Sequence, residues 1–180
     1  MNVFDIVGPV MIGPSSSHTA GALRLGRIAR TLLAESPVWA EMVLYESFAA
    51  TGHGHGTDRA LLAGLMGMET DDAGVRTAFE QAERLGLVTH FLGGTKPAWH
   101  PNLVDITVRG ASGREVRISG ASVGGGAILV RRINGVEVEF TGELHTLIVI
   151  HRDKPGVVAG VARALARESV NIAGMRLYRS

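Results

Sequence analysis

The sequence contains no cysteine. The chain therefore forms no disulfide, supplies no thiolate, and cannot hold an iron–sulfur cluster by the usual four cysteines. Lysine is nearly absent as well, because only Lys96 and Lys154 occur, each directly before a proline in loop-like sequence. A pyridoxal cofactor needs a well-placed lysine for its Schiff base. We therefore expect no pyridoxal phosphate chemistry in this chain.

Long apolar runs and clusters of charge of one sign are also missing. No apolar stretch approaches the roughly 18 residues that a membrane span needs. With 18 basic and 17 acidic residues the formal net charge is +1, and no basic run alternates with aromatic residues as in nucleic-acid-binding proteins. The N-terminus carries Asp5 and lacks the basic region of a signal peptide. We expect a cytoplasmic protein without a membrane or nucleic-acid partner.

What is present is an apolar chain of 180 residues, 46% hydrophobic, which is enough for one sizeable domain or two small ones. Residues 1–140 combine helical and β patterns, which predicts an α+β domain rather than a repeat of βαβ units. The expected elements are a strand and turn at 1–13, helices at 16–35, 59–68 and 75–85, and strands at 41–49, 88–92, 103–108, 115–119, 127–131 and 136–140.

A second, smaller unit is expected after a linker at residues 141–144. Residues 145–180 read as a strand at 146–150, a helix at 157–167 and a strand at 169–178. One β-α-β unit leaves a strand edge and an apolar face without cover. We therefore expect that the chain is truncated, or that it associates with itself or a partner there.

The first candidate site is the stretch Ser15-Ser16-Ser17-His18-Thr19, which follows an apolar run and begins the first expected helix. A serine there can supply the N-cap oxygen. Three hydroxyls, an imidazole and free backbone N–H groups at the positive end of a helix also make a site for a small anion such as a carboxylate. Capping alone would account for only one or two of these residues.

The second candidate is the glycine-rich stretch Gly52-His53-Gly54-His55-Gly56-Thr57-Asp58, which we expect to be a loop. His55 could act as a general base near neutral pH. Alternatively, the two histidines could begin a metal site, although further ligands are not evident nearby. A solvated loop without chemistry is the third interpretation, and the residues alone leave all three open.

Three weaker stretches complete the candidates. Trp99-His100-Pro101-Asn102 is typical of a turn, and residues 120–126, Gly-Ala-Ser-Val-Gly-Gly-Gly, could be a bulged hairpin or a backbone cradle for a carboxylate. No Walker or dinucleotide pattern is present there. His151, Asp153 and Asn171 flank the expected helix of the second unit, where ordinary turn chemistry competes with binding of a zwitterionic amino acid.

Four motifs in order resemble one known family. They are residues 8–21, Gly-Pro-Val-Met-Ile-Gly-Pro-Ser-Ser-Ser-His-Thr-Ala-Gly; residues 51–59, Thr-Gly-His-Gly-His-Gly-Thr-Asp-Arg; His100-Pro-Asn102; and residues 122–126, Ser-Val-Gly-Gly-Gly. Together they look like the β chain of bacterial iron–sulfur-dependent L-serine dehydratase. The resemblance implies that residues 1–140 are similar to the allosteric-substrate-binding domain of some phosphoglycerate dehydrogenases. It implies that residues 145–180 are the first half of an ACT domain, a partial ferredoxin-like βαβ unit.

The resemblance also implies an activity. That family converts L-serine to pyruvate and ammonia, with a [4Fe–4S] cluster on a separate α subunit acting as Lewis acid on the serine hydroxyl. A base removes the Cα proton, hydroxide leaves, and the aminoacrylate product hydrolyses. By resemblance His55 would be the base. The substrate-binding residues would be Ser16, Ser17, His18, Thr57, His100, Asn102 and Ser122.

Two features depart from the family pattern. His53 stands where many relatives have lysine, so no role is assigned to it. His151, Asp153 and Asn171 match effector-contact positions of ACT domains, but Asp153 replaces a frequent asparagine and the second half of the domain is missing. An alternative function is a regulatory module that binds serine or another small anion for a partner enzyme, although such a module has no need of both histidine motifs.

Overall fold

The computed structural model describes residues 10–13 and 15–178, and it divides into two compact units, Met1–Leu144 and His145–Ser180. The division falls directly after the four residues expected to be a linker. Most of the strand expected at residues 1–13 lies outside the described residues, and residues 10–13 form bends rather than a strand.

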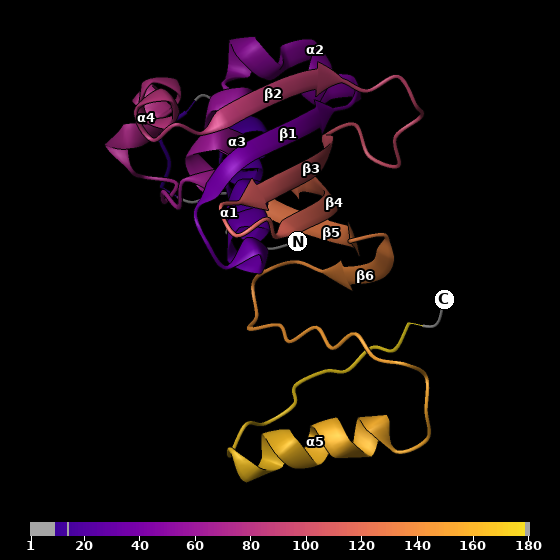
Figure 1. Ribbon diagram of the computed structural model, residues 1–180. Coiled ribbons are helices and arrows are strands. Elements are labelled where there is room, and N and C mark those ends of the chain that lie inside the picture. Colours follow the sequence, from indigo (N-terminus) through magenta and orange to yellow (C-terminus); the bar gives the residue numbers. More distant parts are fainter. Residues whose placement is uncertain (1–9, 14, 179–180) are drawn as a thin grey trace. The chain divides into compact units, whose positions relative to one another are not determined.

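The first unit is built on one mixed sheet of six strands in the order β2-β1-β3-β4-β5-β6 (Figure 1). β1 pairs in parallel with β2, and all other neighbours are antiparallel. The mixed α+β class predicted from the sequence is therefore confirmed. The strands are β1 (Pro37–Leu44), β2 (Val88–Gly93), β3 (Leu103–Gly110), β4 (Glu115–Gly124), β5 (Ala127–Ile133) and β6 (Val136–Phe140).

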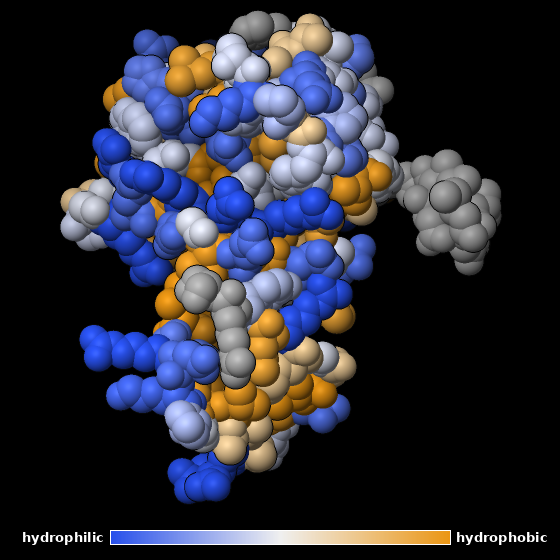
Figure 2. Space-filling model, turned by 90° about the vertical axis from the view of Figure 1, so that its right-hand side faces the viewer, coloured by the Kyte–Doolittle hydropathy of each residue, from blue (hydrophilic) through white to orange (hydrophobic). Residues whose placement is uncertain are grey.

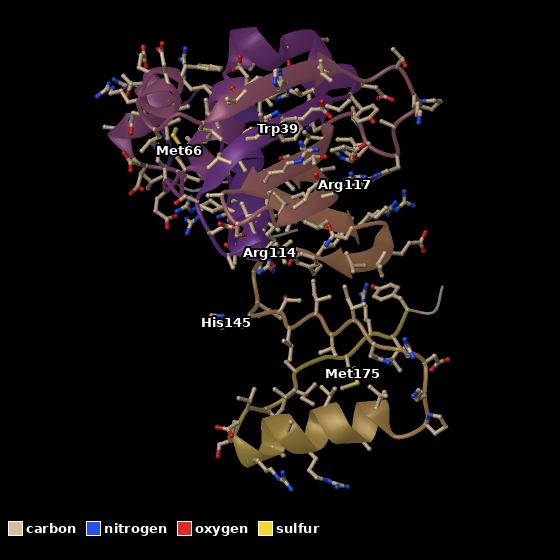
Figure 3. The ribbon with its side chains drawn as sticks, in the orientation of Figure 1. Trp39, Met66, Arg114, Arg117, His145 and Met175 are labelled. Atoms are coloured by element: carbon tan, nitrogen blue, oxygen red, sulfur yellow. The ribbon has the colours of Figure 1, made fainter. Side chains whose placement is uncertain are left out.

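Alternation along the strands separates a buried face from a polar face. The helices α1 (Ala22–Leu33) and α3 (Thr57–Leu65) form a layer on one side of the sheet (Figure 1). On the face toward this layer the side chains of Met42 on β1 and Ile106 on β3 are buried. On the polar face the Arg109 guanidinium lies 4.3 Å from the centre of the Trp39 ring. Figure 3 shows the Trp39 and Arg117 side chains on the strands of this sheet.

The first helix begins where the serine pattern predicts. Ser15 is extended, and its Oγ accepts a hydrogen bond from the backbone N–H of His18 at 3.3 Å. The first turns form a π-helix, η2 (Ser16–Gly21), before α1 continues. Short π-helical segments are often found at functional sites, and this one widens the turn that carries His18.

Helix α2 (Glu46–His55) corrects two predictions. The strand expected at 41–49 is β1 and ends at Leu44, and the expected glycine loop at 50–58 is helical up to His55. Tertiary contacts override the weak helix propensity of the glycines. The Phe48 side chain is fully buried, and its backbone N–H donates to the carbonyl of Pro101 at 3.3 Å. Gly56 then turns the chain with a φ of 71°.

Two short helices, η3 (Ala73–Thr77) and α4 (Ala78–Arg84), lead from α3 to β2 and correspond to the helix expected at 75–85. They complete the crossover between the parallel strands β1 and β2, a connection that needs a dozen or more residues. The sheet thus contains one parallel β-helix-β connection, followed by an antiparallel meander from β3 to β6.

The second unit consists of α5 (Val157–Arg167) flanked by irregular chain. The expected helix is confirmed, but the strands predicted at 146–150 and 169–178 were wrong, because neither segment is a strand in this structure. A strand is stabilised by ladder hydrogen bonds to a neighbour, and no strand pairing is formed in the described part of this unit. Its apolar side chains are instead exposed (Figure 2), among them Leu147, Ile150 and Leu177.

Candidate active site

His18 is held in place by two hydroxyl groups. Its Nδ1 lies 3.3 Å from Oγ of Ser15, and its Nε2 lies 3.1 Å from Oγ of Ser47 on α2. The ring also packs against Phe48, with the ring centres 5.5 Å apart. Both ring nitrogens are therefore engaged, which fixes the orientation of the imidazole.

The structure brings His18 and His55 together from two helices. Their ring centres are 5.0 Å apart in an edge-to-face arrangement. Burial lowers the pKa of His18 below its usual value of 6.5, and the nearby charge of His55 lowers it further. His18 therefore stays neutral to a lower pH than a free histidine would.

His55 is the more available of the two imidazoles. It ends α2, its side chain is exposed, and no hydrogen bond joins its ring to another described residue. A proton acceptor needs a free ring nitrogen, which His18 lacks. Two residues further on, Thr57 begins α3; its side chain is fully buried, and its Oγ1 has no hydrogen-bond partner among the described residues.

His100, Asn102 and Ser122 form a second connected group. Nδ1 of His100 accepts from the backbone N–H of Asn102 at 3.1 Å, and Nδ2 of Asn102 donates to the carbonyl of Ser122 at 3.3 Å. Ser122 also lies directly against Gly21. A Cβ added at Gly21 would lie 2.0 Å from the Oγ of Ser122. This contact joins the group to η2, which carries the half-buried Ser16 and Ser17.

Tyr45 fixes the long loop that carries His100 and Asn102. Its hydroxyl donates to Asp105 at 2.8 Å, and burial together with this carboxylate raises the pKa of Tyr45 to about 12. Gly94 packs so closely on the Tyr45 ring that a Cβ there would lie 2.3 Å from a ring carbon. Both ends of the loop are thereby held beside the start of α2.

A pocket of about 370 Å³ opens beside His55. Its lining includes Thr19 from η2 and Gly56 from the turn between α2 and α3. The side chain of Thr19 is only 3% exposed, and its Oγ1 has no hydrogen-bond partner among the described residues. The pocket thus joins the first candidate stretch to the second.

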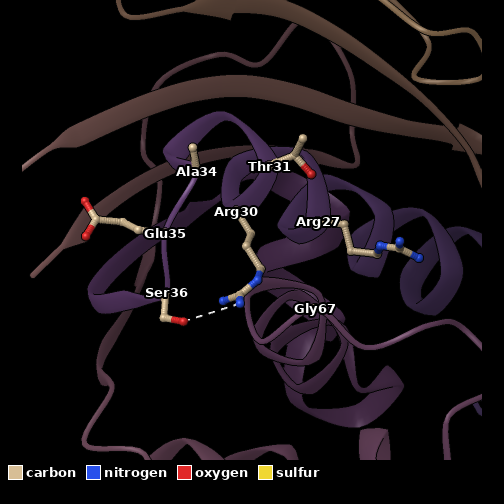
Figure 4. Close-up of a pocket in the computed structure, with 7 residues that line it drawn as sticks. All are labelled: Arg27, Arg30, Thr31, Ala34, Glu35, Ser36 and Gly67. Atoms are coloured by element: carbon tan, nitrogen blue, oxygen red, sulfur yellow. Dashed lines mark hydrogen bonds between the residues drawn. The ribbon is translucent and has the colours of Figure 1, made fainter.

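A larger pocket of about 430 Å³ lies at the far end of α1 and contains none of the candidate residues (Figure 4). Its arginines already have partners. Arg27 pairs with Glu69, and Arg30 donates to the carbonyl of Leu65 and to Oγ of Ser36. The pocket beside His55, which both candidate stretches line, is therefore the candidate site.

The metal interpretation of the two histidines finds no support in the described part of the chain. No group of three His, Asp or Glu side chains gathers there, and the side chain of His53 lies outside what the structure describes. The hairpin interpretation of residues 120–126 is confirmed, since β4 and β5 meet there with an irregular register at Ser122 and Gly124. In the second unit His151, Asp153 and Asn171 are all exposed.

Comparison with known proteins agrees with these motifs. The profile of the serine dehydratase beta chain family matches residues 2–89. The chain is 44% identical to the probable L-serine dehydratase beta chain of Bacillus subtilis, over 99% of this chain and 80% of that protein. The chain belongs to the serine dehydratase beta chain family.

Two further relatives extend this comparison. The L-serine dehydratase beta chain of Peptoniphilus asaccharolyticus is 40% identical, over 95% of this chain and 78% of its own length. The D-3-phosphoglycerate dehydrogenase of Archaeoglobus fulgidus is 32% identical over 81 residues, 45% of this chain and 15% of that protein. No helix in the described part of this serine dehydratase beta chain homologue has the length and apolar character needed to cross a membrane.

Sequence reasoning missed Ser47 and Thr19 as members of this site. Ser47 lies in a stretch that was expected to be a strand, so its hydroxyl was not placed next to His18. Ser47 follows β1 directly and precedes the Gly-His motif. Its hydroxyl comes next to His18 because this segment forms the helix α2. Thr19 belongs to the serine motif but received no separate role.

The lowered pKa of His18 predicts a pH dependence of stability. The unfolded chain binds a proton on His18 more readily than the folded chain does, so the free energy of unfolding should fall as pH decreases through 6.5. In His18→Asn this contribution should be lost. Denaturant unfolding at one pH above and one below 6.5 checks this, and an equal loss of stability on acidification in both proteins would contradict it.

Proposed function

We propose that this chain is the β subunit of an L-serine dehydratase, which converts L-serine to pyruvate and ammonia in a site shared with a separate α subunit. The observation that carries this proposal is the contact between His18 and His55, which brings the two family motifs side by side. The residues of this chain do not fit an iron–sulfur cluster, because it has no cysteine. We place the [4Fe–4S] cluster on the α subunit, and we expect no pyridoxal phosphate.

In this proposal His55 acts as the general base. Its free ring nitrogen accepts the proton from Cα of serine, the C–O bond to the hydroxyl breaks, and the carbon–carbon double bond of aminoacrylate forms. Departure of the hydroxyl belongs to the α subunit's half of the site. Water then converts the tautomerised aminoacrylate to pyruvate and ammonia. His18 remains neutral, so it adds no positive charge that would disfavour protonation of His55.

The hydroxyl groups around the histidines suit the growing negative charge. As the Cα proton leaves, charge develops toward the substrate carboxylate, and preorganised donors stabilise it. Thr57 offers a buried hydroxyl that no described residue bonds, and Ser16 and Ser17 lie at the start of the same helix as His18. Ser122 contacts Gly21 at the end of η2, and hydrogen bonds link Ser122 to Asn102 and Asn102 to His100.

We place the protein in the cytoplasm and propose that residues 1–140 form an allosteric-substrate-binding-like domain and residues 145–180 half of an ACT unit. Two findings support this arrangement: the similarity to a phosphoglycerate dehydrogenase over 81 residues, and the separate compact unit from His145. The exposed apolar side chains of the second unit favour self-association there.

The deciding experiment is co-expression with an α subunit, purification without oxygen, and an assay for pyruvate from L-serine. Activity that requires both chains would support the composite site. If the two chains associate but the α subunit is equally active alone, this chain is instead a regulatory module, and serine binding to it becomes the function.

Ser47 provides a test of how His18 is held. In Ser47→Ala the hydrogen bond to Nε2 of His18 is lost, so we expect turnover to fall about three- to tenfold, as for loss of one neutral hydrogen bond. The NMR signals of the His18 ring should shift at the same time. Thr51→Val is the matched control, because the Thr51 hydroxyl donates to the carbonyl of Ser47 in its own helix and does not contact His18 through a hydrogen bond among the described residues. Unchanged turnover and unchanged His18 signals in Ser47→Ala would contradict this role.

A further inference from the structure

The pocket beside His55 contains two arginines to which neither motif reasoning nor the family resemblance assigns a role. Arg59 lies in the first turn of α3, and Arg76 lies in η3; both line the same pocket. Among the described residues no acidic side chain lines this pocket. The guanidinium groups of Arg59 and Arg76 keep their positive charge throughout the pH range in which proteins are folded.

Neither guanidinium is neutralised by its surroundings. Most arginines of the first unit have a partner: Arg24 donates to the carbonyl of Gly126 at 2.8 Å, and Arg109 and Arg117 both bind Glu115. By contrast, no ion pair or side-chain hydrogen bond joins the guanidinium groups of Arg59 and Arg76 to any described residue. Two unpaired cations facing one pocket favour an anionic ligand.

An independent feature of the same pocket points to a ligand. Thr19 lines it, is only 3% exposed, and has an Oγ1 without a hydrogen-bond partner among the described residues. Buried hydroxyls are normally paired, so such a group needs an explanation. Gly13 closes over Thr19 so tightly that a Cβ there would lie 2.4 Å from this oxygen, which keeps the hydroxyl in place.

We infer that Arg59 and Arg76, together with Thr19, bind the carboxylate of the amino-acid substrate, and that this pocket sets specificity for a free α-carboxylate. The inference deepens the proposed function and rests on it. A guanidinium binds a carboxylate through two parallel hydrogen bonds. A carboxylate held here lies next to His55, which puts Cα of the amino acid within reach of its ring. The volume of about 370 Å³ suits a small ligand.

The test measures binding rather than turnover, on the assembled complex with the α subunit. L-alanine carries the α-carboxylate but has no hydroxyl to lose, and L-alaninamide replaces the carboxylate by a neutral amide. In Arg59→Gln and Arg76→Gln, calorimetry should show an affinity for L-alanine that is about ten- to a hundredfold weaker, as for loss of a charge-assisted hydrogen bond. The affinity for L-alaninamide should stay the same.

Two controls make the result specific. Arg84→Gln removes an exposed arginine of α4 that does not line the pocket, and it should bind L-alanine like the wild type. Arg59→Lys keeps the charge but loses the two-pronged geometry, so it should recover only part of the affinity. Wild-type affinity for L-alanine in both glutamine variants, or an equal loss for L-alaninamide, would overturn the inference.

The same preparations separate this inference from the proposed function. If the wild-type complex produces no pyruvate from L-serine, the proposed activity fails, yet the binding comparison still decides whether the arginines recognise a carboxylate. If the complex is active and the glutamine variants keep the wild-type KM for L-serine, the inference fails and the activity stands. An active complex whose KM for L-serine rises about tenfold or more in the variants supports both.

Discussion

Replacing His55 by alanine should abolish turnover of L-serine while leaving the fold and the association with the α subunit intact. Loss of a general base typically costs a factor of about a hundred to ten thousand in rate, and the kcat of His55→Ala should fall within or beyond this range. The fold should survive because the side chain is exposed and forms no hydrogen bond with a described residue. Steady-state assays of pyruvate formation by the purified complex check this result.

Two controls test this prediction, a variant of another histidine and the addition of free imidazole. His90→Ala removes an exposed histidine from β2, where its ring lies tilted against Trp39 with the ring centres 5.9 Å apart, and it should leave kcat unchanged. Because the site of His55 is open, added imidazole should restore part of the activity of His55→Ala. Full activity without imidazole would show that another group takes the proton.

The antiparallel part of the sheet was predictable because its signals are local. The strands between residues 88 and 140 alternate apolar and polar side chains, and the turns between them carry residues suited to positive φ, as at Asn134 and Gly135, with φ of 49° and 83°. Such two-residue turns select their own geometry. The N-cap of the first helix was predictable for the same reason, since Ser15 bonds a backbone group only three residues away.

The elements that sequence reasoning missed depend on distant contacts. Residues 50–55 contain two glycines and resemble a loop, but they are helical because Phe48 is buried and bonded to Pro101. The strands expected in the second unit need a neighbouring strand, which local pattern cannot supply. The π-helical start of the first helix was also missed, because it depends on Gly21 packing against Ser122, about a hundred residues away in the sequence.

The candidate site shows the same division. The motifs identified His18, His55 and Thr57, since unusual residue types at close spacing are visible in a sequence. The partners that hold or surround them were not visible: Ser47 contacts His18 across 29 residues, and Arg76 reaches the pocket from η3. Both are ordinary residue types whose positions carry meaning only after the chain has folded. Sequence therefore indicates the proposed reacting groups better than the groups that surround them.

The largest effect on stability is expected from Gly64 on α3. This glycine faces α1, where an added Cβ would lie 2.0 Å from the carbonyl oxygen of Leu23. The contact is reciprocal, because a Cβ at Gly26 on α1 would lie 2.3 Å from the carbonyl oxygen of Leu61. The two backbones therefore meet directly at this crossing. Since backbone atoms cannot rotate away as a side chain can, the helices must separate to accept even one methyl group.

We expect Gly64→Ala to lower the free energy of unfolding by about 3 kcal/mol, the upper end for overpacking a core, which lowers the melting temperature by about 6 to 12 °C. Gly54→Ala is the matched control, because Gly54 lies in α2 with nothing within 4 Å of the added Cβ; it should be neutral or slightly stabilising. Thermal and denaturant unfolding of the wild type and the two variants measures both effects.

The double variant Gly26→Ala/Gly64→Ala should lose less stability than the sum of the losses in the two single variants, because one separation of α1 from α3 relieves both contacts. Strict additivity, or a Gly64→Ala protein as stable as the wild type, would show that the helices do not meet backbone to backbone.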